Sequence, residues 1–228
     1  MTVKLHEYAD RETLAEALAG GIAAVLAGGI SNNGRAALAV SGGSTPKLLF
    51  RHLSREPIDW KAVTIFLVDE RYVPDDTDRS NAKLVRENLL TDRAAEATLV
   101  PFWREGVEPD AACRAVAAAL SEFEEGLDAC VLGMGTDGHT ASYFADGDAF
   151  ERATDPDYDT LALPIQSASQ PETRVTLTMP AILGARLLAL HIEGQEKRAV
   201  LERAKAGADL PVTRVLSAAD GVEVFWTG

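Results

Sequence analysis

Four short segments made almost entirely of apolar residues are spaced along the chain: 36–40, 63–68, 127–132 and 187–192. A continuous apolar run of this length is typical of a strand that is covered on both faces, as in a parallel sheet. Helical patterns lie between these strands, and this alternation indicates an α/β fold. The sequence therefore predicts a doubly wound, mainly parallel sheet with helices on both faces. No linker interrupts the pattern, so we expect a single domain, 1–228.

Helical spacing of apolar residues is clearest at 10–27, where Asp10 is placed to cap the start and Gly28 and Gly29 to end the helix. A second helix is expected to begin at Pro46, with Thr45 as its N-cap. Further helices are expected after Ser80, at 110–124 and at 195–204, and weaker strands at 98–102, 161–163, 174–178 and 222–226.

A glycine-rich loop, 133–142, follows the strand expected at 127–132 and contains Asp137 and His139. In open parallel sheets, ligands bind at the carboxyl ends of strands, and glycine lets the backbone approach a ligand closely. His139 suits a general base because the unperturbed pKa of histidine is about 6.5. Asp137 lies on the same face as His139 if the backbone is extended, where it can orient the imidazole. The alternative is a structural histidine that binds a loop carbonyl.

A second glycine-containing loop joins the strand expected at 36–40 to the next helix. Its glycines and the free backbone N–H groups of a helix N-terminus predict a site for phosphate or another anion. The alternative is an ordinary turn between strand and helix. The loop lacks the spacing of a Walker loop and of the dinucleotide fingerprint, which disfavours nucleotide binding. The residues expected to contact the anion are Gly42, Gly43, Ser44 and Thr45.

Charged residues directly follow the strand expected at 63–68, at the same predicted edge of the sheet. Asp69 and Arg71 are therefore candidates for ligand contacts. The alternative is a local ion pair of Asp69 and Glu70 with Arg71.

Arg79, Lys197 and Arg174 are further candidates for the same site. Arg79 lies just before a predicted helix, from where it reaches either a ligand or solvent. Lys197 and Arg198 lie in the first turn of the helix expected at 195–204, where cations are unfavourable unless an anion lies nearby. A solvated basic pair beside Glu196 is an equally good interpretation. Arg174 adds positive charge from a predicted strand.

A formal charge of −13 disfavours both nucleic acid and an anionic membrane as partners. Cys113 and Cys130 lack the spacing of a zinc site and are expected to be buried apolar side chains. The N-terminal segment has no signal-peptide character, and no apolar run is expected to reach membrane-spanning length. These features predict a cytoplasmic protein.

Four segments, in this order along the chain, resemble the motifs of the 6-phosphogluconolactonase family: 41–46, 69–74 with Ser80 and Asn81, 133–142, and 174–178. The resemblance covers essentially the whole chain. It implies a Rossmann-like fold similar to that of glucosamine-6-phosphate deaminase. It also implies hydrolysis of 6-phospho-D-glucono-1,5-lactone to 6-phosphogluconate in the oxidative pentose phosphate pathway, with no cofactor and no metal.

The resemblance also implies roles for the candidate residues. His139 activates the attacking water, and Asp137 positions or polarises His139. Asp69 contacts sugar hydroxyls or supports its loop. The groups that hold phosphate or sugar oxygens are the loop from Gly42 to Thr45, Arg71, Arg174 and Lys197, with Arg79 as a further candidate. The chain departs from the family pattern after Ser142, where it has Tyr143, Phe144, Ala145 and Asp146 in place of Leu-Phe-Pro-Gly.

Two alternatives remain from the sequence. The first is the similar glucosamine-6-phosphate deaminase/isomerase family. Its members carry an additional Glu after the histidine loop, which this chain lacks, and a motif that resembles Asp-Glu-Tyr where this chain has Asp69, Glu70 and Arg71. A non-catalytic sugar-phosphate sensor would keep the anion site but would have no use for His139 beside Asp137. The expected partner is a small phosphorylated sugar lactone; the sequence does not fix the oligomeric state, and a monomer is favoured.

Overall fold

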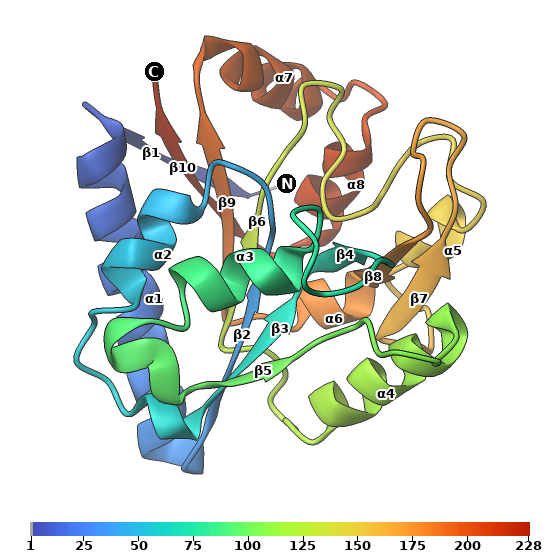
Figure 1. Ribbon diagram of the computed structural model, residues 1–228. Helices are drawn as coiled ribbons and strands as arrows, with labels where there is room; N and C mark the ends of the chain where they lie inside the picture. The colour runs from blue at the N-terminus through green and yellow to red at the C-terminus, as the bar shows by residue number, and fades with distance from the viewer. Residues whose placement is uncertain (1) are drawn as a thin grey trace.

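The structure is a computed structural model that describes residues 2–228. Within these residues, seven parallel strands form the main sheet (Figure 1). Their spatial order is β1 (Val3–Tyr8), β10 (Val222–Thr227), β9 (Leu187–Glu193), β6 (Ala129–Leu132), β2 (Ala36–Val40), β3 (Val63–Leu67) and β5 (Thr98–Val100). The central strands β2 and β6 are buried along their whole length, as their continuous apolar sequences predict. The predicted parallel sheet is confirmed.

A smaller antiparallel sheet, which the sequence did not predict, lies beside the main one. It consists of β4 (Asp69–Arg71), β8 (Arg174–Leu177) and β7 (Ala162–Ile165). Val68 connects the two sheets, because its N–H donates to Val40 O at 2.9 Å and its carbonyl accepts from Leu177 N at 2.8 Å. The expectation of a loop directly after β3 was therefore wrong for Asp69 and Arg71, which lie in a short strand.

Helices cover both faces of the main sheet. In Figure 1, α1 (Arg11–Asn33) and α2 (Lys47–Leu53) lie on one side, and the second sheet lies on the other with α4 (Pro109–Ser121), α5 (Phe150–Ala153), α6 (Met179–Leu183) and α8 (Pro211–Ala218). The remaining helices are α3 (Asn81–Asn88), α7 (Gln195–Lys205) and the 3-10 turns η1 (Trp60–Ala62) and η2 (Asp92–Glu96). The chain therefore has the doubly wound arrangement expected of it.

Helix α1 begins where the sequence predicts but ends later. Asp10 is its N-cap and accepts from Thr13 N at 2.8 Å. The helix continues past Gly28 and Gly29 to Gly34, whose φ of 73° ends it. Gly29 has another function, because a Cβ at this position would lie 2.2 Å from Asp128 Oδ1. The glycine thus allows close packing between α1 and the start of β6 rather than ending the helix.

Two smaller predictions were also wrong, and one strand was missed. The helix after the loop at 41–46 begins at Lys47 with Pro46 as its N-cap, and no side chain caps it, so Thr45 is not the cap. The strand expected at 161–163 is β7 at Ala162–Ile165 and so includes Pro164, which an edge strand tolerates. The sequence did not predict β1, whose residues are only partly buried.

Helix α1 also contradicts the expectation that no apolar segment reaches spanning length. Its 23 residues are long and apolar enough to cross a membrane by length and composition. In the structure, Leu14, Leu18, Ile22 and Leu26 are fully buried in the hydrophobic core. The apolar character of α1 is therefore explained by its packing in the folded protein.

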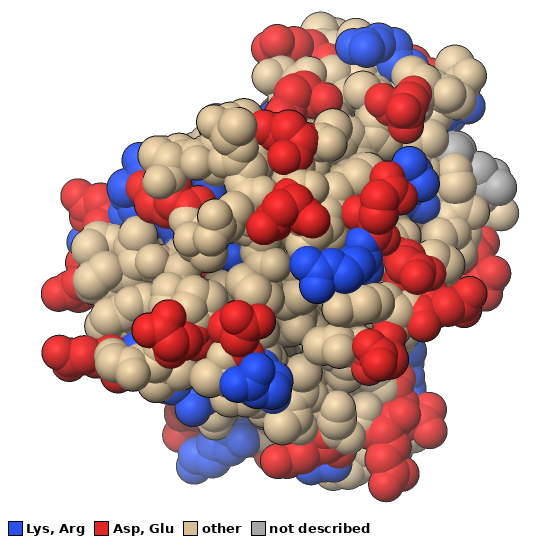
Figure 2. Space-filling model, turned by 90° about the vertical axis from the view of Figure 1, so that its right-hand side faces the viewer, with Lys and Arg blue, Asp and Glu red and all other residues tan. Residues whose placement is uncertain are grey.

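The acidic composition is visible on the surface. Figure 2 shows the side of the molecule that lies to the right in Figure 1, where Asp and Glu side chains are scattered among fewer basic ones. No extended basic patch is visible on this face. Cys113 and Cys130 are buried, as predicted, and both are free cysteines.

Candidate active site

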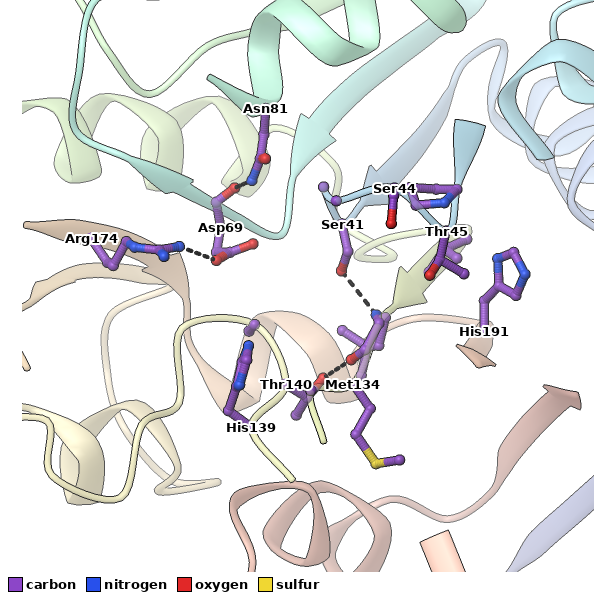
Figure 3. A pocket seen from close by; sticks show the side chains of 18 of the residues that line it. Ser41, Ser44, Thr45, Asp69, Asn81, Met134, His139, Thr140, Arg174 and His191 are labelled. Carbon is purple, nitrogen blue, oxygen red and sulfur yellow. Dashed lines mark hydrogen bonds and ion pairs between the residues drawn. The ribbon is translucent and has the colours of Figure 1, made fainter. Parts of the chain in front are cut away.

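A cavity of about 360 Å³ lies at the carboxyl ends of β2, β6 and β9, between the main sheet and the second sheet (Figure 3). It receives residues from all the sequence motifs that were expected to meet at this edge. The polar residues that line it are Ser41, Ser44, Thr45, Asp69, Arg71, Asn81, His139, Thr140, Gln170, Arg174, His191 and Lys197. Gly42 and Gly43 line it as well.

The loop after β6 holds His139 and Asp137 together. His139 Nδ1 lies 2.6 Å from Asp137 Oδ1, and Asp137 Oδ1 also accepts from the backbone N–H of His139 at 3.2 Å. The sequence predicted that Asp137 and His139 lie together, but it did not predict the backbone conformation that brings them together. The backbone turns here, with Gly138 N donating to Gly135 O at 3.0 Å and Gly138 at a φ of 87°. The turn, rather than extended backbone, brings the two side chains together.

Gly135 makes room for this pair. A Cβ on Gly135 would lie 2.4 Å from both Asp137 Oδ1 and the ring of His139. Position 135 thus requires glycine, because the side chains of His139 and Asp137 occupy the space that a Cβ would need. Because Nδ1 is held by Asp137, Nε2 is the ring nitrogen left for a ligand or a water molecule, and the imidazole is a third exposed.

The pair also sets the ionisation of Asp137. Burial alone would raise the pKa of Asp137, but the charge of His139 and the hydrogen bonds from its ring and backbone outweigh burial. The pKa of Asp137 is therefore below its ordinary value. Asp137 stays a carboxylate at neutral pH and can orient the imidazole.

Asp69 joins three parts of the site. Its Oδ2 accepts from Ser142 Oγ at 2.6 Å and lies 3.5 Å from Arg174 Nη1, and its backbone carbonyl accepts from Asn81 Nδ2 at 2.8 Å. Asp69 therefore links β4 to the histidine loop, to β8 and to the start of α3. Figure 3 shows its carboxylate between Arg174 and the cavity.

Arg71 and Arg174 face each other across the β4–β8 ladder, where they are directly paired in register. Like charges in this position repel each other. Arg71 Nη1 donates to Arg79 O at 2.9 Å and Arg174 Nη2 to Gln170 Oε1 at 2.7 Å, but the Nε of each is buried without a hydrogen-bond partner. Two adjacent guanidinium groups with free donors on a cavity wall are suited to binding an anion or several oxygen atoms.

The alternative considered for this segment, an ion pair of Asp69 and Glu70 with Arg71, does not form. Instead, the Glu70 carboxylate accepts from Ser80 Oγ at 3.0 Å and from the backbone N–H groups of Arg71, Asn81 and Ala82, each at 2.8 Å. It thereby binds the N-terminus of α3. Burial raises the pKa of Glu70 despite these hydrogen bonds. Glu70 is a structural residue that fixes α3 to β4.

The loop after β2 lines the opposite wall. Gly43 has a φ of 96°, and a Cβ on Gly42 would lie 1.8 Å from Asn81 Oδ1. Gly43 is thus required by its backbone conformation, and Gly42 by its close packing on Asn81 at the start of α3. Ser41 Oγ accepts from Gly133 N at 3.2 Å and joins this loop to the histidine loop.

The basic candidates separate into two groups. Arg71, Arg174 and Lys197 line the cavity, and burial lowers the pKa of Lys197. Arg79 does not line the cavity, because its guanidinium pairs with Glu172, with Nη2 2.7 Å from Oε2. Arg198 does not line it either and pairs with Glu202 Oε1 at 3.0 Å.

Sequence reasoning missed several residues on the wall. Asn81 and Met134 lie inside the expected motifs but were not selected, and Gln170 had no recognisable signal. His191 was not among the candidate residues either, because no glycine-rich segment surrounds it, yet it lines the cavity. Its place at the carboxyl end of β9 was the available signal. Among residues 2–228, no cluster of His, Cys, Asp or Glu side chains is arranged to hold a metal ion.

The segment that departs from the family pattern is well packed. The Tyr143 hydroxyl is buried and donates to Leu177 O at 3.0 Å. The ring of Phe144 lies 4.9 Å from the His139 ring and 5.5 Å from the Arg174 guanidinium carbon. Asp146 accepts from Ser167 Oγ at 2.6 Å. Phe144 thus contacts two cavity residues, and Asp146 stabilises the neighbouring loop.

The family of this chain follows from comparison with known proteins. A family model described as glucosamine-6-phosphate isomerases/6-phosphogluconolactonase matches residues 9–226. The chain belongs to this family. Within it, a 6-phosphogluconolactonase of Rhizobium meliloti (strain 1021) is 44% identical over 230 residues, which cover 99% of each chain. One of Mesorhizobium japonicum is 47% identical over 221 residues, covering 96% of this chain and 93% of the other.

A solved structure of the family supports the fold. The crystal structure of a 6-phosphogluconolactonase from Shewanella baltica OS155 has a TM-score of 0.94 and 38% identity, covering 100% of this chain and 98% of the other. The predicted fold class and the resemblance in the four motifs are therefore confirmed.

Proposed function

We propose that this chain is an enzyme that hydrolyses 6-phospho-D-glucono-1,5-lactone to 6-phosphogluconate, as its named relatives suggest. The observation that carries the proposal is the placement of His139. Its Nδ1 is held by Asp137, and its ring lies on the wall of a cavity that also holds Arg71, Arg174 and Lys197. This combines a general base with cations for a phosphorylated substrate.

The proposed reaction is a general-base hydrolysis. His139 Nε2 takes a proton from a water molecule as the water oxygen attacks the lactone carbonyl carbon. Asp137 keeps the imidazole in the tautomer that accepts at Nε2 and stabilises the imidazolium that forms. The tetrahedral intermediate then collapses, the ring C–O bond breaks, and the imidazolium returns the proton to the departing ring oxygen. The products are a free hydroxyl and a carboxylic acid, which releases its proton to the solvent and becomes a carboxylate.

The remaining cavity residues are proposed to bind the substrate. The free N–H groups of Arg71 and Arg174, the Lys197 ammonium and the loop of Gly42, Gly43, Ser44 and Thr45 hold phosphate and sugar oxygens. Asp69 supports this wall through its contacts with Ser142 and Arg174. Arg79 is not part of the proposal because it pairs with Glu172 outside the cavity.

The reaction is tested by generating the phosphorylated lactone in place and following acid release, with spontaneous hydrolysis as the blank. We expect acceleration of hydrolysis by the purified chain and no ammonia from glucosamine 6-phosphate. Ammonia release without lactone hydrolysis would instead indicate a deaminase. Saturable binding of the product without any hydrolysis would indicate a sensor.

We also propose that residues 1–228 form one domain that acts as a monomer in the cytoplasm. A single cluster of buried apolar residues includes Leu14 of α1 and Phe225 of β10, close to the two ends of the chain. Size-exclusion chromatography with light scattering would measure the mass in solution. A mass of 24.3 kDa is expected for a monomer.

A further inference from the structure

His191 is a buried histidine with no partner for its polar atoms. It lies near the end of β9, its residue is 3% exposed, and neither Nδ1 nor Nε2 has a hydrogen-bond partner among the described residues. Leaving a buried polar group without a partner costs stability, so such groups are rare in folded proteins. An apolar residue in β9 would avoid this cost.

The nearest acidic group does not satisfy the imidazole. Glu193 Oε1 is 3.5 Å from His191 Nε2, too far for a good hydrogen bond, and Glu193 Oε2 lies 2.6 Å from Arg11 Nη2. Glu193 is therefore engaged mainly with α1. The imidazole has donor and acceptor capacity left over, and His191 lines the cavity beside Thr45 (Figure 3).

Lys197 lines the same cavity and follows His191 closely in the sequence, in the first turn of α7. Burial lowers the pKa of its ammonium, which forms no ion pair with any of the described residues within 4.0 Å. A buried imidazole without a hydrogen-bond partner and a half-buried ammonium, which has Glu193 and Glu196 nearby but no carboxylate within 4.0 Å, thus lie in one cavity. A group that carries negative charge and several acceptor oxygens would satisfy both.

We propose that His191 binds the phosphate group of the substrate from the floor of the cavity, together with Lys197 and the loop at 41–46. A ring N–H donates to a phosphate oxygen, and Lys197 supplies the opposite charge. A sugar hydroxyl would satisfy the imidazole but not the ammonium, which favours the phosphate. This role rests on the proposed action on a phosphorylated sugar.

The first test is His191→Leu, which removes both nitrogens and keeps an apolar side chain in β9. We expect KM for the phosphorylated lactone to rise about tenfold or more, the range for a lost hydrogen bond to a charged group, with kcat changed less than about threefold. The melting temperature should stay equal or rise, because a buried unpartnered group is removed. An unchanged KM with a lower melting temperature would show that His191 is only a packing residue.

A second test does not depend on lactonase activity. Inorganic phosphate is titrated into the full chain at constant pH and ionic strength, and the imidazole Cε1–H signals are followed by NMR. The His191 signal, assigned by its loss in His191→Leu, should shift and saturate, while that of His52, which pairs with Glu12, should not move. Lys197→Met should weaken this response.

The two tests separate the two proposals. A chain without lactonase activity whose His191 signal responds to phosphate would contradict the proposed reaction but keep the anion site. An active enzyme whose His191 signal is unaffected by phosphate, and whose His191→Leu variant keeps its KM, would overturn the role of His191 and keep the reaction.

Discussion

At the scale of single residues, the site depends on glycines that leave space for neighbouring side chains. Gly135 lies where a Cβ would meet both members of the His139–Asp137 pair at 2.4 Å. The contact of the pair, 2.6 Å between Nδ1 and Oδ1, thus requires that this position has no side chain. Glycine is needed here for space, since its φ is not in the left-handed region.

We therefore predict that Gly135→Ala separates the pair while the fold survives. The kcat for lactone hydrolysis should fall about 10- to 100-fold, a part of the 10²- to 10⁴-fold effect typical of a general base. Steady-state kinetics and circular dichroism measure the two effects. Because the alanine acts through the pair, Gly135→Ala and Asp137→Ala should not be additive in a double-mutant cycle. Full additivity would show that the glycine acts elsewhere.

The motifs recognised in the sequence contain most of the residues that line the cavity, because glycine-rich and charged segments follow apolar strands. His191 was missed, because its place near the end of a strand does not by itself show which way the side chain faces. Strand β9 is apolar, and only the positions of β6, β10 and α7 around it determine whether an imidazole in β9 faces core or cavity. Arg79, in contrast, was selected from the sequence but lies outside the cavity. Its pairing with Glu172 joins residues 93 positions apart, so the local sequence gave no sign of it.

At the scale of elements, the short strand β4 is what completes the site. The main chain leaves the parallel sheet at Val68 and enters the antiparallel one immediately, which places Asp69 and Arg71 over the carboxyl end of β2. The apolar strands were predictable because a continuous run of apolar residues indicates a strand buried on both faces. The three charged residues of β4 and the partly exposed residues of β1 give no such apolar signal, and these strands form because of the strands they pair with.

Helix α1 offers a matched pair of substitutions at adjacent glycines. A Cβ on Gly28 would meet nothing within 4 Å, whereas one on Gly29 would collide with Asp128. Asp128 Oδ2 accepts from Ala37 N at 2.8 Å and so fixes the beginning of β2. Gly28→Ala should leave the free energy of unfolding equal or raise it by up to about 1 kcal/mol, because alanine favours the helix.

Gly29→Ala should instead lower the free energy of unfolding, by about 1–3 kcal/mol, the usual cost of overpacking. Urea denaturation of both variants measures the difference. Equal effects of the two substitutions would mean that Gly29 is not needed for the contact between α1 and β6.

At the scale of the whole molecule, a chain of charge −13 is proposed to bind an anionic substrate. The general repulsion extends over the surface and is screened beyond about 8 Å at physiological salt. The cavity cations lie next to the ligand and are screened less. Local attraction should therefore dominate the affinity, and the acidic surface should have a smaller effect.

We predict that KM of the wild type rises with salt and that Lys197→Met has a higher KM with a weaker salt dependence. A KM that falls with salt would show that the overall negative charge dominates.

Lys197→Met should also be more stable than the wild type at pH 7, because burial lowers the pKa of Lys197 and the folded state disfavours its charge. This advantage should shrink as the pH rises towards about 10, where the unfolded chain also loses the proton.

The most direct measurement of the central claim is the kcat of His139→Ala for the phosphorylated lactone. We expect a loss of about 10²- to 10⁴-fold against the wild type, with product binding and melting temperature little changed. His52→Gln is the control, because His52 pairs with Glu12 and does not line the cavity. A His139→Ala variant that hydrolyses the lactone as fast as the wild type would contradict the assignment of His139 as the general base.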